Sequence, residues 1–116
     1  MVRPRKSRRV CCLPQNNIYG PINATKKPNG IIIMTVEEYE AIRLIDMEGL
    51  NQEESAEMMG VARSTIQRIY EDARRKMACS LVEGKVLRIE GGDFELCKSE
   101  QICDSGFCHR HRHGRK

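Results

Sequence analysis

Apolar residues recur with a helical period over two long stretches of the chain. From Thr35 to Gly49 they fill one wide face, and Glu38 stands three residues after Thr35 as in a capping box, so a helix of about 12 residues is predicted. A longer helix is predicted from about residue 63 to 81, where apolar side chains follow steps of four and three. Its face comprises Ala62, Ile66, Ile69, Tyr70, Ala73 and Met77.

A short helix is predicted between these two. Asn51 is a good N-cap, Glu54 follows it at the third helical position, and Gly60 can adopt the left-handed conformation that ends a helix. Polar and turn-forming residues surround the helical region on both sides. The helices therefore form the centre of the predicted domain.

Two segments have strand character. The β-branched run 31–35 follows the turn signal Asn29-Gly30, and the alternation over 86–90 is followed by Gly91-Gly92 and by a second short run, 94–97. We expect a short strand and a β-hairpin. The predicted fold class is mainly α: a three-helix helix-turn-helix core with a small β element and irregular N- and C-terminal tails.

The spacing within 52–71 is typical of a helix-turn-helix. Such a unit needs a small residue where the helices cross, a glycine at the reversal and an apolar wedge on the second helix, and Ala56, Gly60 and Ile66 supply these. Met59, Val61 and Ile69 are the expected apolar supports. Polar side chains of the second helix would then point outward, where they either keep the domain soluble or contact DNA. The residues predicted to contact DNA from this helix are Arg63, Ser64, Thr65, Gln67, Arg68 and Glu71.

The run 51–68 is similar to the helix-turn-helix in region 4 of sigma-70-type transcription factors. A wider set of segments resembles uncharacterised protein family 0251, a group of small prokaryotic proteins described as predicted DNA-binding. That set comprises Arg3-Pro4-Arg5-Lys6 with Arg8-Arg9, the segment 38–44, the helix-turn-helix and the segment 88–92. The resemblance implies the fold and a DNA-binding role, names no target, and does not extend to the tail after Cys97.

Charge is distributed unevenly along the chain. Residues 1–30 carry seven bases and no acid, whereas residues 31–60 carry eight acids and one base. We predict three parts: a basic irregular arm over 1–30, the DNA-binding domain over 31–97 and a Cys/His/Arg-rich tail over 98–116. The arm could enter a minor groove or act as a non-specific basic tail. Its predicted DNA contacts are Arg3, Arg5, Lys6, Arg8 and Arg9.

The acidic segment 36–48 would repel phosphate, so it is expected to cover the core or to form an oligomer face. Aromatic residues make up only 4% of the chain, which argues against binding of single strands by base stacking. The longest apolar run has four residues, 31–34, too few to span a membrane. The only histidines lie in the terminal tail, no phosphate-binding glycine loop occurs, and the carboxylates cluster on a helix surface, so no catalytic residue and no enzyme activity are predicted.

Cysteine and histidine are dense at the C-terminus. Six cysteines are too few for a disulfide scaffold of this length, so reduced thiols in a cytoplasm are expected. The tail supplies enough soft and imidazole donors for a zinc site, although the spacing also suits an unstructured basic tail. The candidate ligands are Cys103, Cys108, His109, His111 and His113, with Cys97, Cys11 and Cys12 as further donors.

These observations favour a sequence-specific regulator of transcription that binds double-stranded DNA, as a homodimer because one recognition helix contacts few base pairs. The alternative is a metal- or redox-responsive interaction module, for example with RNA polymerase as the partner.

Overall fold

A computed structural model of the chain describes residues 8–23 and 30–96. The helices are α1 (Val36–Ile42), continued by the π-helical turn η1 (Arg43–Met47), then α2 (Gln52–Met59) and α3 (Arg63–Glu83). The strands are β1 (Arg8–Val10), β2 (Ile18–Tyr19), β3 (Ile31–Met34), β4 (Val86–Ile89) and β5 (Phe94–Leu96). The fold is therefore a mixture of three helices and two small sheets, and the description "mainly α" understated its β content.

The predicted helix starts are confirmed. Thr35 caps α1 and Asn51 caps α2, each in a reciprocal capping box with the glutamate three residues later. Gly60 ends α2 and Gly84 ends α3, both with φ of +68° in the left-handed region where a glycine is favoured. Local signals of this kind act within one turn, which is why the sequence pattern located both capping boxes and Gly60 correctly. The predicted end of the third helix, at about residue 81, was two residues short of Glu83.

The sheets differ from the predicted hairpin. β4 lies between two strands, parallel to β3 and antiparallel to β2, while β5 pairs in parallel with β1. The segment 91–93 therefore carries the chain from one sheet to the other instead of turning it back. Two strands also occur inside the part of the chain expected to be irregular, because β4 and β5 offer them pairing partners from far along the sequence.

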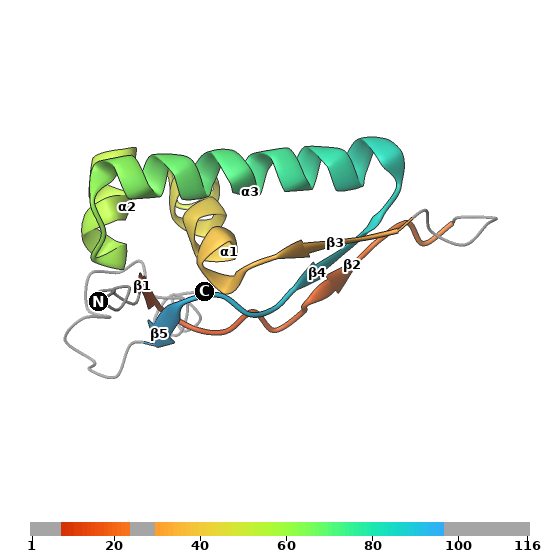
Figure 1. The fold of residues 1–116 in the computed structure, drawn as a ribbon, viewed down its shortest axis with the longest axis horizontal. Helices are drawn as coiled ribbons and strands as arrows, with labels where there is room; N and C mark the ends of the chain where they lie inside the picture. Colours follow the sequence, from red (N-terminus) through yellow and green to blue (C-terminus); the bar gives the residue numbers. More distant parts are fainter. Residues whose placement is uncertain (1–7, 24–29, 97–116) are drawn as a thin grey trace, which may run out of the picture.

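Two apolar clusters hold the helices and the sheets together. One joins α1, η1, α2 and the N-terminal half of α3 and includes Leu44, Met59 and Ile66, all with no exposed surface. The other joins the strands to α1 and to the middle of α3 through Ala73. Figure 1 shows the result: α3 runs along one side of the molecule, with α1 and α2 under its first half and the three-stranded sheet under its second. No helix in the described part of the chain is both long and apolar enough to cross a membrane.

Candidate nucleic-acid interface

The turn between α2 and α3 has the geometry expected of a helix-turn-helix. The N–H of Val61 donates to the carbonyl of Ala56 at 3.0 Å, so the chain reverses immediately at Gly60. Ile66 and Ile69 are buried against Ala56 and Met59, as the wedge pattern predicted. These contacts fix the angle between α2 and the first turns of α3.

The outward face of α3 carries the side chains predicted to contact DNA. Thr65 is half-buried, and the exposed residues are Arg63, Ser64, Gln67, Arg68 and Glu71. Within the described residues, neither Arg63 nor Arg68 forms an ion pair. Two unneutralised guanidinium groups therefore remain on this face, close to Gln67.

The N-terminus of α3 is open. Its N-cap, Ala62, makes no side-chain hydrogen bond, and its first turn holds no acidic residue. By contrast, α1 and α2 begin with capping boxes and acidic first turns. The free N–H groups at the start of α3 can thus bond a phosphate oxygen beside Arg63 and Ser64.

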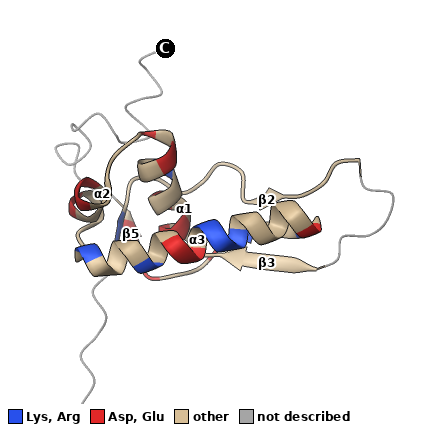
Figure 2. Ribbon diagram, turned by 90° about the horizontal axis from the view of Figure 1, so that it is seen from above, with Lys and Arg blue, Asp and Glu red and all other residues tan. Residues whose placement is uncertain are grey.

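The remaining cations of α3 each pair with a carboxylate of this chain, and Arg74 and Arg75 do so at the surface, with 63% and 73% of their side chains exposed. Lys76 Nζ lies 2.8 Å from Glu38 Oε1, Arg75 lies 3.3 Å from Asp72, and Arg74 lies 4.0 Å from Asp46. The Arg74 guanidinium also covers the ring of Tyr70, 5.4 Å from its centroid. Arg63 and Arg68 are therefore the cations of α3 that carry no ion pair among the described residues, whereas the cations of its middle turns, also blue in Figure 2, are each paired with a carboxylate.

The predicted basic arm does not behave as one unit. Arg8 is only 6% exposed, and its guanidinium lies between Glu37 and Asp93 at 3.9 and 3.8 Å. This buried position argues against the predicted contact between Arg8 and DNA. The cause is its place in β1, which turns the side chain toward α1.

Arg9, the next residue, alternates to the other side of β1 and is half-buried. Its guanidinium packs against the reversal of the helix-turn-helix, since a Cβ added at Gly60 would lie 2.9 Å from Arg9 Nη2. It forms no ion pair within the described residues. Arg9 of β1 therefore places a cation beside the α2–α3 turn, although it is not part of the helix-turn-helix itself. Arg3, Arg5 and Lys6 lie outside the described residues.

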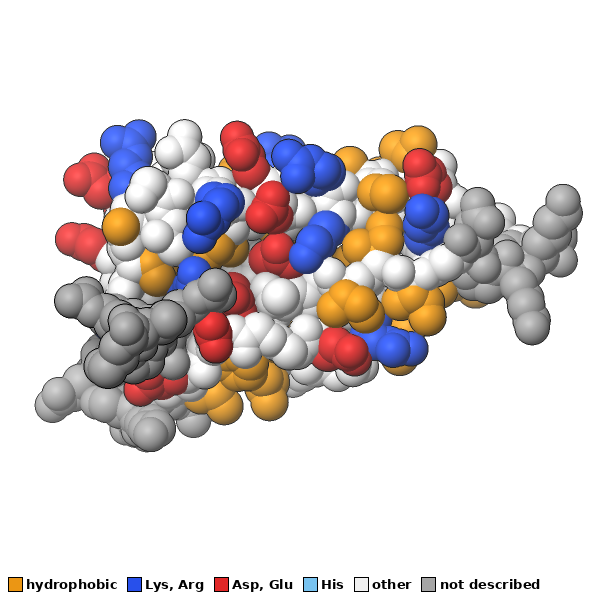
Figure 3. Space-filling model, in the orientation of Figure 1, with side chains coloured by type: hydrophobic (Ala, Val, Ile, Leu, Met, Phe, Trp, Pro, Cys, Tyr) orange, Lys and Arg blue, Asp and Glu red, His pale blue; other side chains and the backbone are white. Residues whose placement is uncertain are grey.

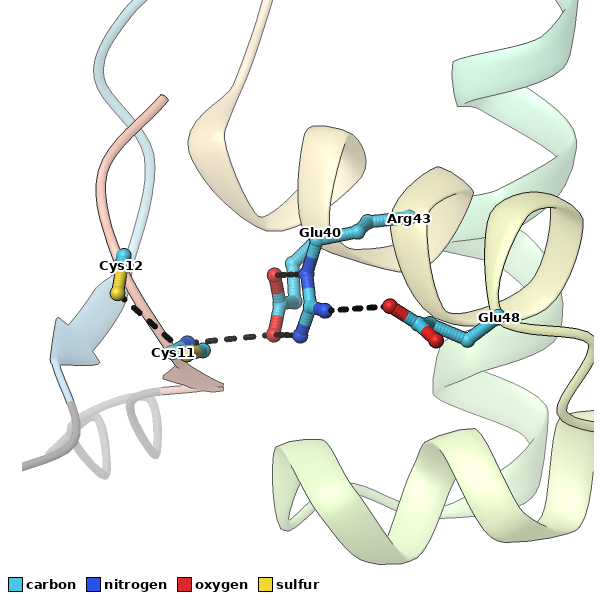
Figure 4. A network of polar contacts seen from close by, with 5 residues as sticks. All are labelled: Cys11, Cys12, Glu40, Arg43 and Glu48. Atoms are coloured by element: carbon cyan, nitrogen blue, oxygen red, sulfur yellow. Dashed lines mark hydrogen bonds and ion pairs between the residues drawn. The ribbon is translucent and has the colours of Figure 1, made fainter. Parts of the chain in front are cut away.

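A buried charge network, not anticipated from the sequence, connects β1 to the helices (Figure 4). Arg43 is 5% exposed and donates from Nε and Nη2 to the two carboxylate oxygens of Glu40, both at 2.9 Å, and from Nη1 to Glu48 at 3.4 Å. The N–H of Cys11 donates to the same Glu40 carboxylate at 3.2 Å. The spacing of Glu40 and Arg43 on one helix was the available signal, but such pairs are usually on the surface.

Burial alone would lower the pKa of Arg43, but the hydrogen bonds and negative charge of Glu40 outweigh it, and the pKa of Arg43 is raised. The guanidinium thus stays charged. Glu37 and Glu38 are buried as well, facing Arg8 and Lys76. The acidic segment therefore neutralises bases of this chain, which favours its role as a cover of the core.

The predicted metal ligands fall mostly outside the described residues, namely Cys97, Cys103, Cys108, His109, His111 and His113. Cys11 and Cys12 are described, with their sulfur atoms 3.5 Å apart. Cys11 is disulfide-bonded, so the expectation of a reduced thiol is wrong at this position, whereas Cys12 is free. Among residues 8–23 and 30–96, no three metal-ligating side chains converge.

Comparison with known proteins identifies the relatives of this chain. The family described as "Protein of unknown function DUF134" matches residues 1–97. A UPF0251 protein of Desulfitobacterium hafniense (strain Y51) is 57% identical over 97 residues, 84% of this chain and 78% of the relative. The chain belongs to uncharacterised protein family 0251.

Other members of family 0251 match over nearly their whole length. A UPF0251 protein of Thermoanaerobacter sp. (strain X514) is 46% identical over 97% of this chain and 100% of the relative, and one of Halothermothrix orenii is 43% identical over 100% and 91%. No solved structure is significantly similar. The family match ends at residue 97, which agrees with the resemblance ending at Cys97 in the sequence.

Proposed function

We propose that this protein binds double-stranded DNA at specific sequences and regulates transcription, with the start of α3 in the major groove. The observation that carries the proposal is the exposed face of Arg63, Gln67 and Arg68 on a helix-turn-helix whose wedge, Ile66, is fully buried. The packing of α3 against α2 through Ile66 matters because base recognition requires side chains held at fixed positions along the groove.

Each group has a chemical role in this proposal. Arginine can donate two hydrogen bonds to guanine, glutamine can donate and accept with adenine, and Glu71 can accept from the amino group of cytosine. Ser64 and the open N–H groups of α3 suit a phosphate oxygen, and so does the hydroxyl of Thr65 where it is exposed. Phosphate contacts set the register, and base contacts select the sequence.

The exposed carboxylates of α2 limit how DNA can approach. Glu53, Glu54 and Glu57 are all exposed, and phosphate brought against them would be repelled. Arg9 lies at the far end of α2, beside Gly60. The approach consistent with these charges brings the backbone toward the α2–α3 turn and α3, and keeps it away from the start of α2.

The proposal is tested by titrating the full-length protein with random duplex DNA at two salt concentrations and then selecting bound sequences from a random pool. We expect affinity that falls steeply with salt, and a recurrent sequence after selection, because phosphate contacts release counterions and base contacts discriminate. Binding without an enriched sequence would overturn the sequence-specific part. No binding at low salt would overturn the DNA role and favour an interaction module with a protein partner such as RNA polymerase.

A further inference from the structure

The second half of α3 differs sharply from the first. Residues 77–82 contain no charged side chain, and Leu81 and Val82 are 84% and 80% exposed. Met77 is 41% exposed, and Ala78 is exposed between them. In Figure 2 the charged positions of α3 lie in its earlier turns and at its terminal Glu83, with this uncharged stretch between. One helix thus presents a polar face at its start and an apolar face at its end.

A groove lies directly beside the apolar face. It has a volume of about 360 Å³ and runs between the end of α3 and the segment around Tyr19 and Pro21, with Met77 and Leu81 on its rim and Leu87 at its wall. A second apolar space of about 200 Å³, lined by Tyr39 and Ile42, shares Tyr19, Met77 and Leu87 with the groove. Protruding apolar side chains and a space that can receive them therefore occur on one surface.

Exposed apolar side chains are concentrated at this end of the molecule (Figure 3). Of the eleven large hydrophobic residues exposed in the described part of the chain, eight lie on β2, β3, the second half of α3 or next to them. They are Ile18, Tyr19, Ile22, Ile31, Ile33, Met77, Leu81 and Val82. Single exposed hydrophobic residues are ordinary, but a group of them at one end of a molecule can mark an interaction surface. Ile18 and Ile33 both pair with Arg88 and lie on the sheet face turned away from α3, whereas Tyr19, Met77 and Leu81 line the groove.

We propose that a second copy of this chain covers the end of α3, with Leu81 and Val82 of each copy seated against the groove of the other. A two-fold contact requires a surface complementary to itself, and a rim side chain next to a groove on the same helix meets this requirement. The charges at its edge cancel, since Lys85 Nζ lies 2.9 Å from Glu83 Oε1. Two copies can therefore meet here without bringing like charges together.

The spacing along α3 supports a second copy over another occupant, and this step rests on the proposed DNA binding. At 1.5 Å per residue, Gln67 lies about 21 Å from Leu81 along the helix. Two copies of α3 that meet at Leu81 can therefore hold their Gln67 residues up to about 42 Å apart. One turn of DNA, about 34 Å, falls within this range, so two helix starts held in this way can reach successive half-sites on one face of the duplex.

The test measures the mass of the full-length protein by sedimentation equilibrium without DNA. We expect twice the chain mass of 13.3 kDa for the wild type and a dimer that is at least about 100-fold weaker for Leu81→Glu, because an isologous contact carries each change twice. Met47→Glu is the matched control: Met47 is 70% exposed but lies on η1, and its variant should remain a dimer. Circular dichroism must show that both variants are folded. If Leu81→Glu does not fold, Val82→Lys replaces it in the same measurement.

Failure of this inference is distinct from failure of the proposed function. A wild-type protein that is monomeric at its solubility limit, or a folded Leu81→Glu dimer, overturns the interface whatever the DNA result. A monomer that binds the dye anilinonaphthalene sulfonate, and loses this binding in Leu81→Glu, reassigns the groove to a small apolar ligand and also overturns it. A dimer lost in Leu81→Glu in a protein without DNA affinity supports the interface and overturns only the DNA role.

Discussion

Arg63 and Gln67 stand on the exposed face of α3 within its first two turns, where a helix in the major groove meets base edges. We predict that Arg63→Ala and Gln67→Ala each weaken binding to the selected sequence by about 1–3 kcal/mol and relax preference at one or two base pairs, because each loses a two-point contact. Fluorescence anisotropy on selected and scrambled duplexes measures both effects. Arg88→Ala, an arginine of β4 paired with Glu90, is the matched control and should bind as the wild type does. Unchanged affinity and unchanged sequence preference in both α3 variants would remove the recognition role from this helix.

Arg43 supplies a prediction about stability. Its guanidinium neutralises Glu40 and Glu48 in the interior, so Arg43→Met leaves two carboxylates buried without their cation. Removing one partner from a buried pair costs about 3–5 kcal/mol. Urea denaturation should therefore show a loss of this size in the free energy of unfolding. For the exposed pair of Arg75 with Asp72, Arg75→Ala should cost at most about 1 kcal/mol. Equal losses in the two variants would show that the buried network adds nothing.

Tyr39 gives a prediction about pH. Burial raises the pKa of its hydroxyl above 10.0, and the charge of Arg43 offsets this only partly. The neutral form is thus favoured in the folded state, so its contribution to stability is complete below pH 10 and is lost as pH rises through the raised pKa. Urea denaturation across the alkaline range should show a decline that is shallower in Tyr39→Phe. Identical profiles would mean that another group controls the alkaline limit.

At the level of whole elements, the boundary of the arm decides which basic residues can contribute to DNA binding. β1 begins at Arg8 and pairs with β5, so a deletion that spares the fold must stop at residue 7. It removes Arg3, Arg5 and Lys6, and the slope of log K against log salt should shrink by about 2–3 units if all three displace counterions. Binding measured over a salt series checks this. An unchanged slope would mean that these three bases do not touch phosphate.

The helices could be predicted from the sequence because their determinants are local. Each of these determinants involves residues at most a few positions apart: the capping box of Thr35 with Glu38, that of Asn51 with Glu54, and the chain reversal at Gly60. Strand pairing could not be predicted in this way, because alternation shows that 86–89 is a strand without indicating its neighbours. The buried position of Arg8 was equally hidden: in the sequence it matches Arg3 and Arg5, and only the folded positions of Glu37 and Asp93 distinguish it.

For the molecule as a whole, the tail offers a test of the zinc hypothesis. If Cys103 and Cys108 bind zinc with two of the tail histidines, protein purified without chelator should hold one equivalent by elemental analysis. The metal should leave in mild acid, since thiolates and imidazoles must be deprotonated to bind it. Changing both cysteines to serine should remove it, whereas Cys79→Ser, on α3, should not. A wild type without zinc would favour the alternative of a basic tail that binds no metal.

The strand pairings have a consequence for how this chain folds during its synthesis. β1 pairs with β5, 86 residues later, and β2 and β3 both pair with β4. The helix-turn-helix cluster lies within 41–69 and can assemble while the ribosome is still adding residues to the C-terminal third. The strands of the N-terminal third have to wait until β4 and β5 emerge. Arg9 therefore reaches its place beside Gly60 last, so a chain interrupted before β4 would carry a formed α3 but lack the docked N-terminal strand beside it.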